Sequence, residues 1–387
     1  MRRPGWIVLT LLTACSSTSA IVEDSGPLST MAGTGSSSAS TSSTATATTS
    51  TSLAPIEVTF AFTGDTLVHS PLWAVAAANG SSSGSPFDFR PMFADVRGVI
   101  SAADFAICHL ETPFAPPGVE LSTMPKYQVP TEVATSLADA GYDRCSTASN
   151  HTMDGGVASI DHTVAALADV GISQAGMART PEEIEPTVID AGGLAVSHLS
   201  YTIHFNGMSL PADEPWRSAR IDIDRILADA GTARGLGARL VIVSLHWGNE
   251  GSSRPNPQQK EWSQRLAESG LVDIVVGSHP HVLQPIERIA DMWVLNSLGN
   301  FISAMPTGDK WPPSTQDGAI VLFDVTERVD GSVEVQRPRV VPTWVDREAG
   351  YVVRDVRSWL ADHPDDVRVQ ESFERTLKTM GEFVEAA

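Results

Sequence analysis

The 387-residue sequence has no long hydrophobic run, little positive charge and only three cysteines. Its apolar stretch at residues 6–12 is too short to span a bilayer, and no other stretch is apolar enough to do so. The net charge of −20 argues against nucleic acid or anionic lipid as a direct partner, because phosphate groups demand basic patches. Cys108 and Cys145 allow two interpretations, a disulfide outside the cytoplasm or a pair of buried free thiols.

The N-terminus has the pattern of an export signal. A basic Met-Arg-Arg start precedes a short apolar core and small residues. The ending Leu-Thr-Ala-Cys resembles a bacterial lipobox, in which Cys15 is lipidated and becomes the mature N-terminus. The alternative is an ordinary signal peptide that is cleaved nearby. We therefore expect a lipoprotein signal over residues 1–15 and an exported protein, lipid-anchored on the outer side of a bacterial cell membrane.

Residues 16–55 are rich in Ser, Thr, Ala and Gly and include the run SSSASTSSTATATTSTS. Such a segment cannot bury enough apolar surface to offset its chain entropy, so we expect a disordered tether. The remaining chain is long enough for one large domain. We place this domain at residues 56–350, followed by a C-terminal helical extension over residues 351–387 that packs on it.

Within the domain, short β-rich runs alternate with amphipathic segments. The strands are expected at residues 58–63, 105–109, 143–147, 194–201, 239–245, 272–276, 293–296 and 320–325. Helices are expected at residues 131–140, 157–168 and 256–269, each followed by a glycine. This alternation predicts an α/β layered fold with much parallel pairing. Residues 318–325 and 333–341 follow each other without a helix, which predicts a second, more antiparallel sheet.

Polar residues that can bind metals follow several of these strands directly. Six of the ten histidines lie at strand ends, together with carboxylate and amide side chains: Asp65, His69, His109, Glu111, Asn150, His151, Asp154, His246, Glu250, His279, His281, Asn296 and Asn300. In open α/β sheets, ligands bind outside the carboxyl ends of the strands. Any one of these residues alone would be an ordinary structural residue, but together they predict a shared site.

The mixture of donors indicates the kind of metal. Carboxylate, amide and imidazole ligands suit Mn²⁺, Fe²⁺ or Zn²⁺ better than an all-oxygen calcium site or a thiolate site. The donors are too many for one tetrahedral ion. Two ions about 3.5–4 Å apart, bridged by a carboxylate, would use them and would suit phosphate-ester hydrolysis.

The order of the motifs resembles a known family. GD…H, LE, NH-x-x-D-x-G, HWG-x-E, G-x-HPHV-x-Q and SLGNF occur in that order between about residues 60 and 301. The same order is found in the CapA or poly-γ-glutamate capsule synthesis proteins, a branch of the calcineurin-like metallophosphatase superfamily. The resemblance implies a four-layer α/β/β/α sandwich with a dinuclear metal centre.

The resemblance also implies a role for each residue. Asp65 and His281 would bind the first ion, with His69 as a further ligand or a neighbour of the ligands. Glu111 would bridge both ions, and Asn150, His246 and His279 would bind the second. His151 would act as the general acid, and Asp154 would orient it or cap the local turn.

Two positions depart from the family pattern. His109 stands where the family usually has Asn before Leu-Glu, and its side chain would either point away from the site or alter its surroundings. Ser149 stands where the family commonly has a second Asn. Neither change removes an expected ligand.

These expectations favour a surface-tethered, dinuclear metallohydrolase that acts on phosphoester or related bonds of an anionic cell-envelope polymer or its precursor. An alternative is a non-phosphatase protein that binds the polymer or assists capsule or poly-γ-glutamate assembly. A third is a surface module that uses metal only for structure.

The proline between two of the expected ligands predicts their geometry. Pro280 favours an extended His279, so that the side chains of His279 and His281 would face the same way.

Overall fold

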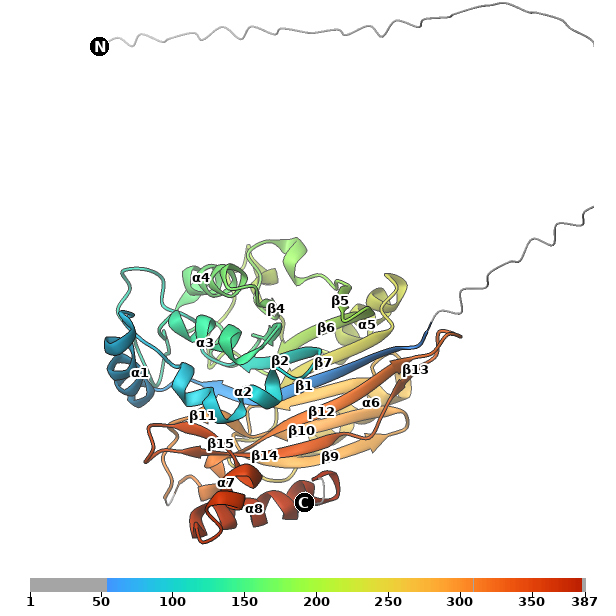
Figure 1. The fold of residues 1–387 in the computed structure, drawn as a ribbon. Coiled ribbons are helices and arrows are strands. Elements are labelled where there is room, and N and C mark those ends of the chain that lie inside the picture. The colour runs from blue at the N-terminus through green and yellow to red at the C-terminus, as the bar shows by residue number, and fades with distance from the viewer. Residues whose placement is uncertain (1–53, 309, 385–387) are drawn as a thin grey trace, which may run out of the picture. The chain divides into compact units, whose positions relative to one another are not determined.

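The computed structural model describes residues 54–308 and 310–384 (Figure 1). The expected signal peptide and nearly all of the expected tether lie outside these residues. Within the described part of the chain, the helices are too short or too polar to cross a membrane.

The first sheet has nine strands and is centred on β1. Its order is β15-β14-β12-β1-β2-β3-β4, with β11 also paired to β1 and β13 to β12. β1 runs parallel to β2 and β11 and antiparallel to β12. The strand bounds are β1 Ile56–Leu67, β2 Phe105–Leu110, β3 Arg144–Ser146, β4 Ser173–Ala175, β11 Asn300–Ser303, β12 Asp317–Glu327, β13 Val333–Val335, β14 Arg339–Asp346 and β15 Val352–Asp355.

The second sheet has six strands in the order β5-β6-β7-β8-β10-β9. Its four central strands are parallel, and β5 and β9 are antiparallel at the edges. The bounds are β5 Ile189–Ala191, β6 Leu194–Thr202, β7 Leu240–His246, β8 Ile274–Ser278, β9 Leu283–Ile289 and β10 Met292–Leu298.

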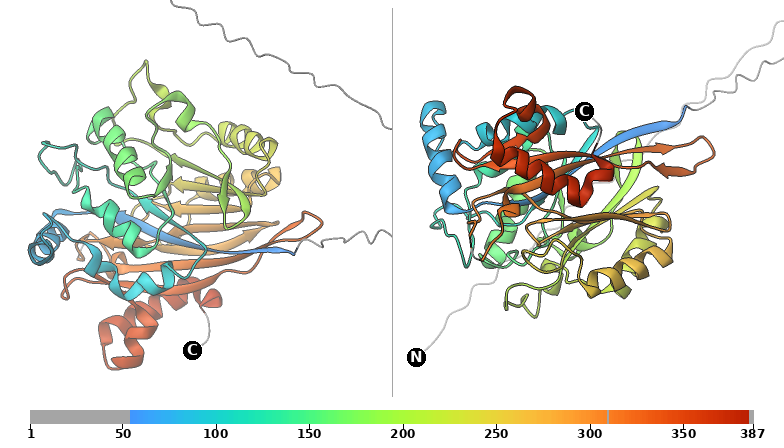
Figure 2. Two further views of the ribbon diagram at one scale, coloured as in Figure 1. Left: turned by 45° about the horizontal axis from the view of Figure 1, so that its top comes forward. Right: turned by 90° about the horizontal axis from the view of Figure 1, so that it is seen from below.

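The two sheets pack face to face around an apolar core. Phe60, Phe62 and Phe323 from the first sheet meet Ile242 and Leu295 from the second. Helices cover both outer faces: α1 Ser70–Ser83, α2 Ala94–Ile100, α3 Glu132–Ala140 and α4 Gly156–Asp169 follow strands of the first sheet, and α5 Ile223–Gly235 and α6 Pro257–Ser269 follow strands of the second. Short 3₁₀ turns are η1 Arg90–Phe93, η2 Pro181–Ile184, η3 Pro215–Arg217, η4 Pro313–Gln316 and η5 Gly381–Phe383. The expected four-layer α/β/β/α sandwich is therefore confirmed (Figures 1 and 2).

Local sequence explains where the best-defined helix begins and ends. Asn256 caps α6 by accepting from the Gln259 amide, and the Gln259 side chain accepts from the Asn256 amide in return. Pro257 occupies the first turn, where its missing N–H costs nothing. Gly270 ends the helix with a φ of 64°, a conformation that favours glycine.

The expectation that residues 318–325 and 333–341 belong to a second, more antiparallel sheet is wrong. β12, β13 and β14 extend the first sheet on the side of β1 opposite β2. β2, which follows β1 through a helical crossover, pairs with one edge of β1 and leaves the opposite edge free. β12 pairs with that opposite edge over eight residue pairs. The single strand expected at residues 333–341 is divided into β13 and β14, with Pro338 between them.

The chain beyond residue 350 differs in part from a purely helical extension. Val352–Asp355 form β15 at the edge of the first sheet, where Val353 is buried. The helices α7 Val356–Asp362 and α8 Val367–Met380 follow. α8 packs against β9 of one sheet and β14 of the other, and Figure 2 shows both helices together at one side of the sandwich.

Cys108 on β2 and Cys145 on β3 stand opposite each other and form a disulfide, with their α-carbons 4.5 Å apart. Of the two interpretations that the sequence allowed, the structure contains the disulfide. It links the two strands that lead into Glu111 and Asn150.

Candidate metal centre

The predicted ligands converge from both sheets at one rim of the sandwich. Asp65 lies near the end of β1, Glu111 directly follows β2, and Asn150 lies four residues beyond β3. From the second sheet, His246 is the last residue of β7, and the loop after β8 carries the two remaining histidines. Six predicted ligands are thereby brought together and are almost fully buried: Asp65, Glu111, Asn150, His246, His279 and His281.

Short distances connect these residues across the sheet boundary. His281 Nδ1 lies 2.9 Å from Asp65 Oδ2, and His246 Nε2 lies 3.0 Å from Asn150 Oδ1. Glu111 stands between the two pairs: its Oε1 is 3.8 Å from His281 Nε2 and 4.0 Å from His246 Nε2. One carboxylate is thus shared by two groups of donors.

The donors fit divalent cations because several of them lack any other partner. Among the residues that the structure describes, no hydrogen-bond partner reaches the two buried carboxylate oxygens of Glu111 or the buried Nδ1 atom of His279. Burying an ionised carboxylate without a partner costs on the order of several kcal/mol. A cation bound between Glu111 and the imidazoles would provide that partner.

The pKa shifts of Glu111 and His281 indicate that this group of side chains attracts positive charge. Burial raises the pKa of Glu111 well above its ordinary value, although His281 opposes the shift. Burial lowers the pKa of His281, but the charges of Glu111 and Asp65 outweigh burial and raise it to about 10. Burial lowers the pKa of His279 to about 3, which leaves it neutral and able to donate a lone pair.

The backbone of the HPH loop differs from the extended form that the proline suggested. His279 has a φ of 93° and His281 a φ of 57°, both in a region that side chains with a Cβ rarely adopt. The extended expectation is wrong because the strand ends at Ser278 and the loop turns back over β1. There the His279 amide donates to Asp65 Oδ1 over 3.3 Å. Such strain persists only where surrounding contacts hold it, as they do here.

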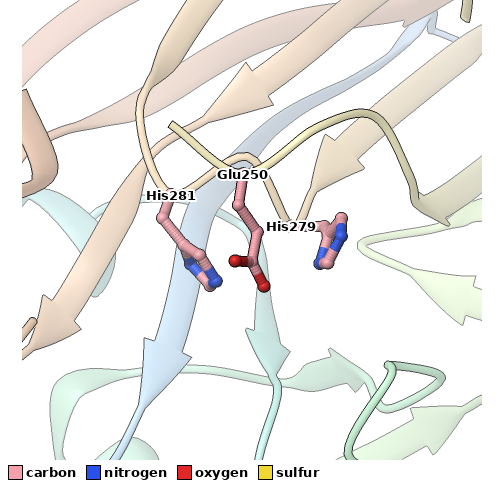
Figure 3. A group of neighbouring side chains, drawn as sticks. All are labelled: Glu250, His279 and His281. Atoms are coloured by element: carbon pink, nitrogen blue, oxygen red, sulfur yellow. The ribbon is translucent and has the colours of Figure 1, made fainter. Parts of the chain in front are cut away.

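Glu250 is a functional candidate to which the sequence analysis gave no role. Its carboxylate comes from the loop after β7, and it lies with one atom each of His279 and His281 in a group spanning at most 4.8 Å (Figure 3). Unlike the other donors, Glu250 is exposed. The HWG-x-E spacing was the signal that could have identified it.

His109 points into the site rather than away from it. Its Nε2 lies 3.0 Å from His246 Nδ1, and its Nδ1 lies 2.8 Å from Ser146 Oγ. Burial lowers its pKa to about 4. The expectation that His109 points away is therefore wrong: it alters the surroundings of the predicted ligand His246 and supports the orientation of that ring.

His69 lies beside the site without a short contact to Asp65. Its Nδ1 is 3.1 Å from the Leu67 carbonyl oxygen and 3.3 Å from the Ala304 amide, so only Nε2 remains for another partner. Its ring packs edge-on against Tyr127, with the centroids 5.5 Å apart. Burial lowers its pKa to about 4. Its role as a ligand stays a prediction.

His151 and Asp154 form a close pair next to these ligands. His151 Nδ1 lies 2.6 Å from Asp154 Oδ2, and the same oxygen accepts from the Tyr127 amide over 2.7 Å. The Tyr127 ring packs edge-on against the imidazole. Asp154 thus orients His151 and leaves its Nε2 available for a substrate.

Two further residues position the ligands. Ser149, at the second departure from the family pattern, donates to the Glu111 carbonyl oxygen over 2.6 Å and accepts from the His151 amide. Asn300 lies with its Oδ1 3.1 Å from His281 Nδ1 and donates to the Thr315 carbonyl oxygen. Asn300 was noticed in the sequence as a strand-end amide, but its partner could not be inferred.

A cavity of about 280 Å³ opens beside this cluster. Asn150, His151, Asp154 and Glu250 line one part of it. A substrate in the cavity would lie within reach of both the candidate ligands and the His151–Asp154 pair.

Comparisons with known proteins place the chain in a family. The chain is 25% identical over 279 residues to the PGA biosynthesis protein CapA of Bacillus subtilis, a match covering 71% of this chain and 70% of that protein. It is 26% identical over 208 residues to the capsule biosynthesis protein CapA of Bacillus anthracis, covering 53% of this chain and only 49%, about half, of that protein.

Similar solved structures include a putative 5'-nucleotidase from Staphylococcus aureus, with a TM-score of 0.46, 13% identity and coverage of 82% of this chain and 58% of that one. Another is the calcineurin-like phosphoesterase YfkN from Bacillus subtilis, with a TM-score of 0.40, 14% identity and coverage of 84% and 98%. The model of the bacterial capsule synthesis protein PGA_cap matches residues 59–305, more than half of the chain. The motif resemblance is thereby confirmed, and the chain belongs to the PGA_cap family of bacterial capsule synthesis proteins.

Proposed function

We propose that this protein is a metal-dependent hydrolase that cleaves phosphoester or related bonds of an anionic cell-envelope polymer or its precursor. The observation that carries the proposal is Glu111, which lies between two groups of imidazole, carboxylate and amide donors. Its two buried carboxylate oxygens have no hydrogen-bond partner within residues 54–308 and 310–384. A structural metal site seldom requires so many buried donors, whereas two-metal hydrolysis does.

The donors divide into two groups around Glu111. Asp65 and His281, with His69 beside them, would hold one ion, while Asn150, His246 and His279 would hold the other. When bound, two ions of a transition metal such as Mn²⁺, Fe²⁺ or Zn²⁺ would supply the positive charge that polarises the scissile bond and lowers the pKa of the attacking water. The neutral His246 and His279 suit this role, since burial keeps both pKa values below the ordinary range.

His151 is the residue that would protonate the leaving oxygen. Asp154 fixes the imidazole through Nδ1, so that Nε2 can carry a proton towards the cavity. General acid catalysis of this kind contributes about 10²–10⁴-fold to a rate. Asp154 touches His151 and the Tyr127 amide, and therefore acts by positioning the acid.

The N-terminal sequence supports the proposed location of the substrate. The signal-like residues 1–15 and the Ser/Thr-rich residues 16–55 support a domain that is exported and lipid-anchored on the outer side of the cell membrane. The relatives' names, which refer to capsule and PGA biosynthesis, support an anionic envelope polymer or precursor as the partner.

Those names also favour a second function, in which the protein binds the polymer or assists its assembly without turnover. An acidic protein would then contact an anionic chain through bound cations. The two functions share the metal centre and differ in whether an ester is hydrolysed.

The test combines metal analysis with hydrolysis. The purified full chain is analysed for bound metal by mass spectrometry and is assayed with p-nitrophenyl phosphate and bis(p-nitrophenyl) phosphate, beside His281→Ala and His151→Ala. We expect about two metal equivalents, hydrolysis that His281→Ala abolishes or nearly abolishes, and hydrolysis that His151→Ala slows. Two equivalents without turnover on either ester would favour assembly, and a protein that binds no metal would refute both functions.

A further inference from the structure

The cavity beside the candidate metal centre contains an unusual share of the protein's lysines. The sequence contains only four lysines, at positions 126, 260, 310 and 378, within a chain of net charge −20. Two of them, Lys126 and Lys310, line the cavity together with Asn150, His151, Asp154 and Glu250. Half of the lysines of a strongly acidic protein are thus gathered in one cavity, where they attract negative charge.

Lys126 is held in place by its neighbour in the chain. Tyr127 is fully buried, its amide donates to Asp154 Oδ2, and its ring packs against His151 with the centroids 4.7 Å apart. The backbone of Lys126 is therefore fixed, because the next residue in the chain contacts both His151 and Asp154. Its side chain is exposed and forms no ion pair within residues 54–308 and 310–384, so the ammonium group is available to a ligand.

Lys310 is placed by the aromatic residue that follows it. Its Nζ lies 4.8 Å from the centroid of the Trp311 ring. Trp311 in turn packs close to Gly251, because a Cβ built on that glycine would lie only 3.7 Å from the ring. Gly251 adjoins Glu250, so the Lys310–Trp311 segment stands at the border of the metal centre.

The rest of the cavity wall is less polar. Met124 and Met208 line it together with Trp311, and Met124 is 64% exposed. Methionine and tryptophan provide adaptable apolar contacts. Two ammonium groups beside such a surface suit an anionic group carried on a short apolar spacer.

We infer that this cavity binds a second anionic group of the substrate, on Lys126 and Lys310, while the first lies at the metal centre. The substrate class is therefore a molecule with two anionic groups joined by a short, partly apolar linker, the second being a carboxylate or a phosphate. The inference rests on the proposed function for the position of the first group. It adds the requirement for a second charge, which a generic phosphate ester lacks.

Binding of non-hydrolysable probes tests this inference without turnover. Methylphosphonate carries one anionic group, whereas phosphonoacetate, 3-phosphonopropionate and 4-phosphonobutyrate add a carboxylate at increasing distance. We expect the Mn²⁺-loaded full chain to bind at least one of the three tighter than methylphosphonate by about threefold to tenfold at low salt, the range for exposed ion pairs. Calorimetric titration measures each dissociation constant.

Variants assign the preference to the two lysines. The double substitution Lys126→Met and Lys310→Met should bring the ratio of the two dissociation constants close to one, while Lys126→Arg and Lys310→Arg should keep it. Lys260→Met, on the exposed face of α6, is the matched control for loss of one positive charge and should keep the ratio. A preference that survives the double Met substitution overturns the inference.

The remaining outcomes separate the inference from the proposed function. Equal binding of methylphosphonate, all carboxylate probes and propane-1,3-bisphosphonate, in a protein that still hydrolyses p-nitrophenyl phosphate, overturns the inference alone. A preference for propane-1,3-bisphosphonate without one for the carboxylates supports it with a phosphate as the second group. A preference for two-anion probes in a protein that hydrolyses no ester supports the inference and refutes hydrolysis.

Discussion

The backbone amide of His279 donates a hydrogen bond to Asp65 Oδ1 over 3.3 Å, although 214 residues separate the two in the chain. This bond joins the loop after β8 in the second sheet to the end of β1 in the first. The candidate metal centre is therefore built across the contact between the sheets, and the packing of the sandwich determines how far apart the predicted ligands lie.

Replacing Glu111 by Gln should remove at least one of the two proposed ions. The amide keeps the shape of the side chain but loses the charge that would bridge both donor groups. We expect affinity for the more weakly held ion to fall by more than about 100-fold, the upper range for ligand-supporting residues. Metal content after gel filtration checks this, with Glu261→Gln on the exposed face of α6 as control. Two retained equivalents would argue against the bridging role.

Replacing His151 by Asn should slow hydrolysis most for poor leaving groups. Phenoxide needs a proton from the acid more than p-nitrophenoxide does, so kcat for phenyl phosphate should fall by about 10²–10⁴-fold and kcat for p-nitrophenyl phosphate by less. Asp154→Asn should show the same pattern at smaller size, because it removes only the orienting contact. Metal content should stay at the wild-type value. An equal loss for both esters would show that His151 is not the general acid.

Replacing His109 by Asn should make the metal-free protein less sensitive to acid. The pKa of His109 is lowered by burial to about 4, against about 6.5 in the unfolded chain. Between these values the unfolded state binds the proton first, so the stability that the neutral His109 contributes is lost as the pH falls from 6.5 towards 4. The variant should recover up to about 3 kcal/mol of that loss. Urea unfolding of chelator-treated protein at pH 7 and pH 4.5 measures it, and an unchanged difference between the two pH values contradicts the prediction.

Replacing Arg375 by Gln should destabilise the protein more at neutral than at acidic pH. Arg375 Nε and Nη2 donate to the buried Asp317 from α8, at 2.6 and 2.8 Å. We expect a loss of about 2–3 kcal/mol at pH 7.5, less than for a fully buried pair because the guanidinium is partly exposed.

The pH dependence follows from Asp317. Burial raises its pKa although Arg375 lowers it, and loss of Arg375 raises it further. A carboxyl with a raised folded pKa contributes stability at low pH that is lost as the pH rises through that value. Chemical unfolding at pH 4.5 should therefore show a smaller cost than at pH 7.5. Asp317→Asn added to Arg375→Gln should remove the pH dependence of the cost, and its persistence would implicate another group.

The layered fold was predictable because buried runs such as residues 239–245 and 272–276 are long, β-branched and followed directly by polar donors. The same feature predicted which residues meet, since parallel strands in both sheets end at one rim. The assignment of β12 to the first sheet was not predictable, because both faces of a buried strand read as apolar whichever neighbour it has. The positive φ of His279 was also hidden, since it results from a contact with a residue 214 positions away. Glu250 was counted among the strand-end donors but received no role, because its contact with His279 and His281 depends on how two separate loops meet.

The pairing of β1 with β12 limits how early the domain can complete its first sheet during synthesis. Thr59 Oγ1 donates to Asp324 Oδ1 over 2.8 Å, across 265 residues, and the two strands pair along most of β1. During synthesis from the N-terminus, β2 becomes available to one side of β1 early, whereas β11 and β12 emerge only after some 190 further residues. Until then β1 presents an open, apolar strand edge, which is the type of surface on which nascent chains aggregate. One edge of β1 therefore stays unpaired until most of the domain has been synthesised.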